Sequence, residues 1–213
     1  MSTLPEPTGG GDFELPPAGT HLAVAYRVID LGTQKTAFNG EEKTAHKIMI
    51  SWELPEETME NGKPFTISQR YTWSMHEKAT LRKHLEAWRG KTFTDAVFGP
   101  KGFNVKNVLG KGCVLTITHA EKGEKHFANI ASVSKLMKGM AAPAPVNEQV
   151  YLWLTPDLWE PSVFFKLSQG LQAVIMKSPE YAKLNGTADD EPMADDDVPT
   201  ADRHPDMNDE IPF

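Results

Sequence analysis

The chain has 213 residues, of which 39% are hydrophobic and 24% charged. We therefore expect a soluble globular protein with one principal domain. Its single cysteine, Cys113, excludes an internal disulfide framework and a zinc site built on cysteines, and it fits a reducing, cytoplasmic compartment. The sequence begins without the basic and apolar runs of a signal peptide, and no run of about 18 apolar residues predicts a membrane span.

Charge is unevenly distributed along the chain. The formal net charge is −7, but residues 19–139 contain 18 Lys and Arg against 12 Asp and Glu. Residues 186–213 contain one Arg against 10 Asp and Glu. A basic body followed by a strongly acidic tail favours binding of a polyanion by the body.

Five stretches of residues 19–139 predict strands. Apolar and polar residues alternate in them with the period of a half-buried strand. Asn39-Gly40 and Asn61-Gly62 mark turns between the first three, and Lys122-Gly123 joins the last two as a hairpin. The predicted strands cover residues 19–32, 44–54, 64–75, 112–120 and 125–133.

One helix is predicted between the third and fourth strands. Apolar residues recur at helical spacing over residues 79–88. Ser74 precedes Glu77 by three positions, as in a capping box, and Gly90 ends the helix. The order of three strands, one helix and two strands is that of the five-stranded OB-fold. We expect residues 19–139 to form a mainly β domain, an OB-type β-barrel with one inserted α-helix.

The remaining segments flank this domain. Residues 1–18 are rich in Pro and Gly and predict a flexible N-terminal arm. Residues 140–185 begin with a Pro-containing hinge and continue as a helical extension that packs on the barrel or on another subunit. Within them, residues 151–154 either add a strand or pack on the barrel. Residues 186–213 hold few large apolar side chains and predict a disordered acidic tail.

The tail finishes on a short acidic and apolar motif, Asp209-Glu210-Ile211-Pro212-Phe213, here called the tip. Phe213 offers a ring and an α-carboxylate, and Pro212 stiffens its approach. Together with Asp206, the acids steer the tip toward a basic rim. Such a segment suits an apolar pocket that lies beside an Arg or Lys of a partner protein.

The tip resembles that of bacterial and phage single-stranded DNA-binding proteins, whose tails end in acids followed by Ile-Pro-Phe. The resemblance covers these five residues closely and the wider plan as architecture only. It implies binding of a helicase, primase, nuclease or recombinase through the tip. The arm of residues 1–18 and the extension depart from the ordinary bacterial plan, so a phage-encoded member, acting in the cytoplasm of a bacterial host, is expected. Its assembly as a homo-oligomer stays open.

Binding of single strands requires cations that follow the phosphates and rings that stack on the bases. Individual Lys residues are ordinary surface charges, so their density in the basic body carries the prediction. Trp52, Tyr71 and Trp73 also share faces with apolar residues, which leaves a core position open for each. The cationic candidates are Arg27, Lys35, Lys43, Lys47, Lys63, Arg70, Lys122 and Lys125, and the stacking candidates are Phe38, Trp52, Tyr71 and Trp73.

No pattern in the sequence predicts catalysis. The histidines lack metal-ligand spacing, so no metal, no cofactor and no enzymatic activity are expected. The leading expectation is a protein that coats and protects single-stranded DNA during replication, recombination and repair and recruits partners through the tip. Two alternatives stay open: a strand-annealing or recombination-mediator protein, and an adaptor or inhibitor that carries the tip but does not bind DNA.

Overall fold

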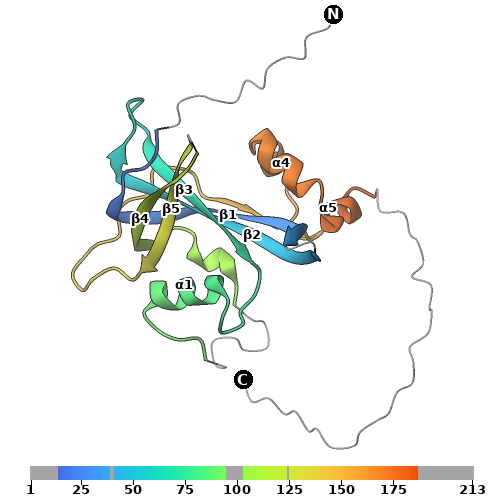
Figure 1. Cartoon of the computed structure of the whole chain (residues 1–213), viewed down its shortest axis with the longest axis horizontal. Coiled ribbons are helices and arrows are strands. Elements are labelled where there is room, and N and C mark those ends of the chain that lie inside the picture. The colour runs from blue at the N-terminus through green and yellow to red at the C-terminus, as the bar shows by residue number, and fades with distance from the viewer. Residues whose placement is uncertain (1–13, 39–40, 95–102, 124, 187–213) are drawn as a thin grey trace, which may run out of the picture.

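The computed structural model describes residues 14–38, 41–94, 103–123 and 125–186. Its centre is a six-stranded sheet, with helices at two places around it (Figure 1). The expectation of a mainly β protein is confirmed. The strands are β1 (Gly19–Phe38), β2 (Glu41–Thr58), β3 (Pro64–Thr72), β4 (Gly112–Lys122), β5 (Lys125–Ser134) and β6 (Val150–Leu152).

The long strand β1 organises the sheet. The order is β3-β2-β1-β4-β5, with antiparallel neighbours throughout. The first part of β1 pairs with β4, from Gly19 to Val24, and β6 pairs with it in parallel beyond that point, from Arg27 to Ile29. The two end strands, β3 and β5, contact each other. Residues 150–152 therefore add a strand, one of the two alternatives that the sequence left open.

The β1–β2 pair extends further than predicted. Pairing continues from Val24 opposite Glu53 to Phe38 opposite Glu41, across register shifts near residues 26 and 31. Most of the predicted polar loop after residue 32 is therefore strand, because the antiparallel ladder continues through polar residues. The predicted turn at 39–40 lies outside the described residues.

Helix α1 (Thr80–Arg89) lies beside the sheet and begins later than predicted. Its N-cap is Ala79, without a side-chain hydrogen bond. The Ser74 hydroxyl instead accepts from the backbone N–H of His76 at 3.3 Å. The predicted capping box is therefore wrong. Gly90 ends the helix as predicted, in the left-handed region at φ 66°.

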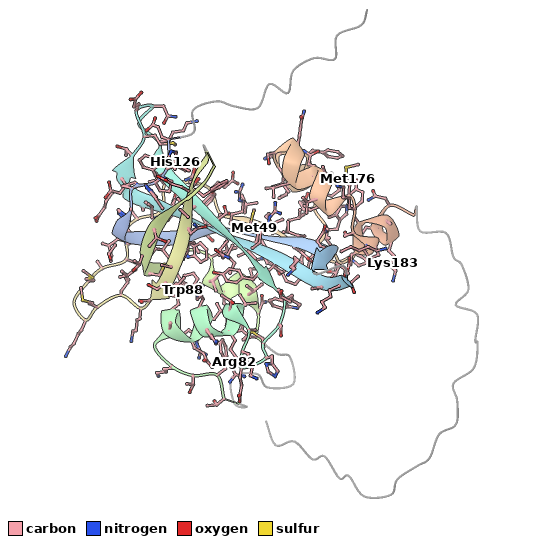
Figure 2. The ribbon with its side chains drawn as sticks, in the orientation of Figure 1. Met49, Arg82, Trp88, His126, Met176 and Lys183 are labelled. Carbon is pink, nitrogen blue, oxygen red and sulfur yellow. The ribbon has the colours of Figure 1, made fainter. Side chains whose placement is uncertain are left out.

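An apolar inner cluster lies between the sheet and α1. Trp88 points from α1 toward the sheet (Figure 2), and its Nε1 donates to the Gly112 carbonyl at 2.8 Å. Its ring centroid lies 5.8 Å from that of Trp52 on β2. The 3-10 helix η1 (Val105–Val108) adds Val105 and Val108 to this cluster.

The C-terminal extension forms a second, outer cluster on the other face of β1 and β2. Met49 (Figure 2) faces this cluster, whereas its neighbours Ile48 and Ile50 face the inner one. The extension comprises β6, α3 (Pro161–Phe165), α4 (Gln169–Ile175) and α5 (Pro179–Leu184). In the described part of the chain, no helix is long and apolar enough to span a membrane. The outer cluster contains Ile29, Leu31, Met49, Leu152, Leu154, Phe164, Leu167 and Ile175.

Carboxylates on β1 and α5 attach the extension to the sheet. Asp30 on β1 accepts from Leu154 N–H at 3.2 Å and from His46 Nε2 at 2.7 Å. On α5, Glu180 accepts from the backbone and the hydroxyl of Thr33 at 2.8 and 2.6 Å, and it lies 3.4 Å from His46 Nδ1. The hydrogen bond to Asp30 raises the pKa of His46, although burial opposes this.

A third carboxylate holds the segment that leads into β6. Glu53 on β2 has no exposed surface. It accepts from the backbone N–H groups of Val146 and Asn147, both at 2.8 Å, and from the Asn147 side-chain amide. A buried acid is stable only with such donors, so the path of residues 146–147 is set by the sheet.

Candidate nucleic-acid interface

A basic cleft lies where β3 ends and α1 begins. Its volume is about 480 Å³. The basic side chains are Lys47 from β2, Arg70 from β3 and Lys78 from the connection to α1, which also contributes His76; these four residues define the basic cleft. Among the described residues that line it there is no carboxylate. The lining residues are Lys47, Gln69, Arg70, Tyr71, Thr72, Ser74, His76, Lys78, Ala79 and Thr80.

Strand register explains why Lys47 and Arg70 meet. Lys47 pairs with Thr72 across β2 and β3, and Arg70 lies two residues before Thr72 on the same face. The ammonium group of Lys47 donates to the Thr72 hydroxyl at 2.7 Å. Cations interspersed with Ser and Thr hydroxyls are the groups that contact phosphates in nucleic-acid complexes.

Two of the predicted stacking residues are core residues. Trp52 and Tyr71 are 1% and 3% exposed, so neither ring can stack on a base, and those two predictions are wrong. The Tyr71 hydroxyl is hydrogen-bonded to His84 Nδ1 at 2.9 Å. Burial raises the pKa of Tyr71 and lowers that of His84. The side chains of Trp52 and Tyr71 face the inner cluster because alternation along β2 and β3 points them inward.

Trp73 is half-buried beside the basic cleft and belongs to an aromatic group. Its backbone N–H donates to the backbone carbonyl of His46, the residue before Lys47. Its ring lies edge-on to Trp153 at 5.2 Å. Tyr151 and His46 lie roughly parallel to Trp153, at 5.8 and 6.4 Å. These contacts join β6 to the ends of β2 and β3, and they leave only part of each ring exposed.

The remaining cationic candidates lie elsewhere. Lys35 and Lys43 are exposed on the far part of the β1–β2 pair. Lys63 immediately precedes β3, at the end of that strand opposite the basic cleft, about 23 Å from Arg70 at roughly 3.3 Å per residue. Arg27 lies on the outer face, where its Nε donates to Ser51 Oγ at 3.1 Å.

Other predicted site residues cannot be placed by their side chains. The backbones of Lys122 and Lys125 pair at the end of the β4–β5 hairpin, and Phe38 closes β1, but their side chains lie outside the described part. The tip residues and Asp206 also lie outside it.

His76 and Lys78 were missed by the sequence analysis. They lie in a short connection whose side chains follow neither strand nor helix periodicity. The closeness of Arg70, His76 and Lys78 in the sequence is the signal that could have found them.

Neither a metal centre among the described residues nor a known relative provides further evidence about this site. Among the described residues, no group of three or more His, Cys, Asp or Glu side chains could hold a metal ion. No model of a known protein family matches the sequence, and no curated protein matches it.

Proposed function

We propose that the chain binds single-stranded DNA in the basic cleft, coats it during replication, recombination and repair, and recruits partner proteins through the tip. One observation carries the proposal. Lys47, Arg70 and Lys78 converge with His76 on a cleft whose described lining holds no carboxylate. A phosphate backbone is the ligand that neutralises such a row of charges.

The fold supports the same proposal. The order β3-β2-β1-β4-β5, with β3 in contact with β5, suits a sheet that curls into an OB-type barrel. We propose that fold for residues 19–139. In OB-folds the face of strands 2 and 3 binds oligonucleotides, and Lys47 and Arg70 belong to β2 and β3.

Fluorescence anisotropy of a labelled oligo-dT tests the cleft. The double variant Lys47→Gln/Arg70→Gln should bind about 10- to 100-fold more weakly at low salt than the wild-type chain. The slope of log affinity against log salt should also fall by about 1.4, since each lost phosphate contact contributes about 0.7 for a single strand.

The matched control is Lys138→Gln/Lys177→Gln, which removes the same charge from two exposed positions outside the cleft. It should bind within about two-fold of wild type. Equal losses in both double variants would mean that overall charge drives binding and that the cleft has no special role. No binding by the wild-type chain would favour an adaptor that carries the tip. Faster annealing of added complementary strands would favour the annealing alternative.

Recruitment through the tip is tested separately. Phe213→Ala should abolish the pull-down of a replicative helicase, primase, nuclease or recombinase from host extract, because a partner's apolar pocket loses its anchor. Oligo-dT affinity should stay unchanged. Met207→Ala, in the same tail, serves as the control. Unchanged pull-down with Phe213→Ala would contradict recruitment through this residue.

A further inference from the structure

A second cavity lies between the C-terminal half of α1 and η1. Its volume is about 330 Å³, within the range of about 300–1,000 Å³ that small-molecule sites occupy. Apolar and aromatic side chains form most of its wall, and no carboxylate lines its described part. We call it the α1–η1 pocket. Its lining residues are Leu85, Trp88, Arg89, Phe103, Asn107, Val108, Lys111 and Gly112.

Arg89 places a hydrogen-bond donor without a described acceptor beside this pocket. Its guanidinium lies 4.5 Å from the centre of the Phe93 ring, which orients it. Yet Nη1 is buried and makes no hydrogen bond with any described residue. A buried donor without a partner is costly, more so on a charged group. Lys111 lies on the same rim, so the two cations together suit an anion.

The rest of the wall suits a flat ring. Phe103 is half-buried and offers aromatic surface, and the edge of the otherwise buried Trp88 lies beside Leu85 and Val108 at the apolar floor. Asn107 is exposed on the rim, and its amide can both donate to and accept from the edge of a base. An anion joined to a polar-edged aromatic ring is the chemistry of a nucleotide.

The position of the pocket connects it to the basic cleft. Lys78 and Thr80 line the cleft at the beginning of α1, and Leu85 and Arg89 line the pocket near its end. The ten residues of α1 span about 15 Å. A single strand that leaves the cleft along α1 therefore reaches the pocket within a few nucleotides.

We propose that the α1–η1 pocket is a nucleotide subsite, which holds a base against Phe103 and the exposed edge of Trp88 and a phosphate against Arg89 and Lys111. The ligand is either one nucleotide of the bound strand or a free mononucleotide, since both present the same chemistry. Binding of a nucleotide of the bound strand rests on the proposed function. Binding of a free mononucleotide does not.

The first experiment titrates the full-length chain with deoxyadenosine monophosphate and with deoxyadenosine by calorimetry. The monophosphate should bind at least about 10-fold more tightly. Arg89→Gln should remove most of that difference, whereas Lys83→Gln, the same charge change at an exposed position of α1, should not. Asn107→Trp, which fills the pocket and keeps Arg89, should block both ligands. Unaltered monophosphate binding in Arg89→Gln and Asn107→Trp would overturn the proposal.

The second experiment distinguishes a nucleotide of the bound strand from a free mononucleotide as the ligand. Oligo-dT of about 4 to 16 nucleotides is titrated into wild type, Arg89→Gln and Lys47→Gln/Arg70→Gln. If the strand enters the pocket, Arg89→Gln weakens only the longer oligonucleotides, by about 5- to 10-fold, while the cleft variant weakens all lengths. If no oligonucleotide binds but the monophosphate does, the proposed function fails and the pocket stands as a mononucleotide site.

A peptide is the competing occupant. A synthetic peptide of residues 206–213 also carries acids and an aromatic ring. If this peptide binds in an Arg89-dependent manner and neither nucleotides nor oligonucleotides do, the pocket is a peptide site and the proposal is overturned. Absence of binding by all three ligands would overturn it equally.

Discussion

The two faces of β1 and β2 are buried in different ways. The inner cluster is almost entirely apolar and combines β1 to β5 with α1 and η1, all within residues 23–133. The outer cluster is covered by residues 150–184, and the buried carboxylates Asp30 and Glu53 fix that cover in place. The difference indicates that the inner cluster maintains the sheet itself, while the outer cluster attaches an added layer.

The largest effect is expected from Trp52→Ala in the inner cluster. Loss of a fully buried Trp side chain should lower the free energy of unfolding by about 4 kcal/mol, measured by chemical denaturation. Oligo-dT affinity should be unchanged at temperatures where the variant is folded. Normal stability with lost DNA binding would restore Trp52 as a stacking residue and contradict its assignment to the core.

A smaller effect is expected from Phe164→Ala, the corresponding truncation in the outer cluster. It should cost about 3 kcal/mol. Hydrogen exchange should locate this loss in α3, α4 and α5, because sub-global opening follows packing units. Equal loss of protection in β2 and β3 would show that the two clusters unfold as one unit and would remove the distinction.

Glu53→Gln should destabilise the chain by about 2 kcal/mol, since the amide nitrogen faces backbone N–H donors that it cannot accept from. Glu56→Gln, at an exposed position of β2, provides the control. Differential exchange at residues 146–152 identifies the affected segment. An effect no larger than that of the control would mean that the outer layer is held by apolar packing alone.

The smallest effect concerns pH. His46 has a folded pKa above its ordinary value of 6.5, so its contribution is complete below about pH 6.5 and is lost as pH rises through the folded pKa. Between pH 6 and pH 8, wild type should lose about 1 kcal/mol more unfolding free energy than His46→Gln. The exposed His126→Gln should behave like wild type. Parallel pH profiles for wild type and His46→Gln would exclude a role for this histidine.

The contribution of Glu180 to stability has the opposite pH dependence. Burial opposes its ionisation, but hydrogen bonds from Thr33 outweigh this and hold its pKa below the ordinary value of 4.5. Its contribution is therefore present above about pH 4.5 and is lost as pH falls through the lower folded pKa. The contact between α5 and β1 should be strongest between about pH 4.5, set by Glu180, and about pH 6.5, set by His46.

Local signals in the sequence predicted much of the fold. Alternation located all five main strands, and Gly90 marked a helix end that the structure confirms. Ser74 failed as a cap because its hydroxyl satisfies a nearer N–H in the connection before α1. The sequence predicted that the extension packs on the barrel or on another subunit. It did not predict which face of β1 the extension covers, because the covering segment lies more than 100 residues away.

The candidate site was predicted only in part. Lys47 and Arg70 were found from strand alternation and charge, and they meet in the basic cleft. The same alternation could not decide whether Trp52 and Tyr71 point to solvent or core, because period 2 gives two faces without naming the buried one. Arg89 was missed because the α1–η1 pocket forms where two successive elements pack together, and neither strand nor helix periodicity predicts how they pack.

The parallel pairing of β6 with β1 has a consequence for synthesis of the chain. Residues 27–29 of β1 leave the ribosome more than 100 residues before residues 150–152, which pair with them. At about 5–20 residues per second, this edge of β1 stays uncovered for roughly 6 to 25 s. An uncovered strand edge is a template for pairing with other chains, so we expect truncated or stalled chains that lack β6 to associate through β1.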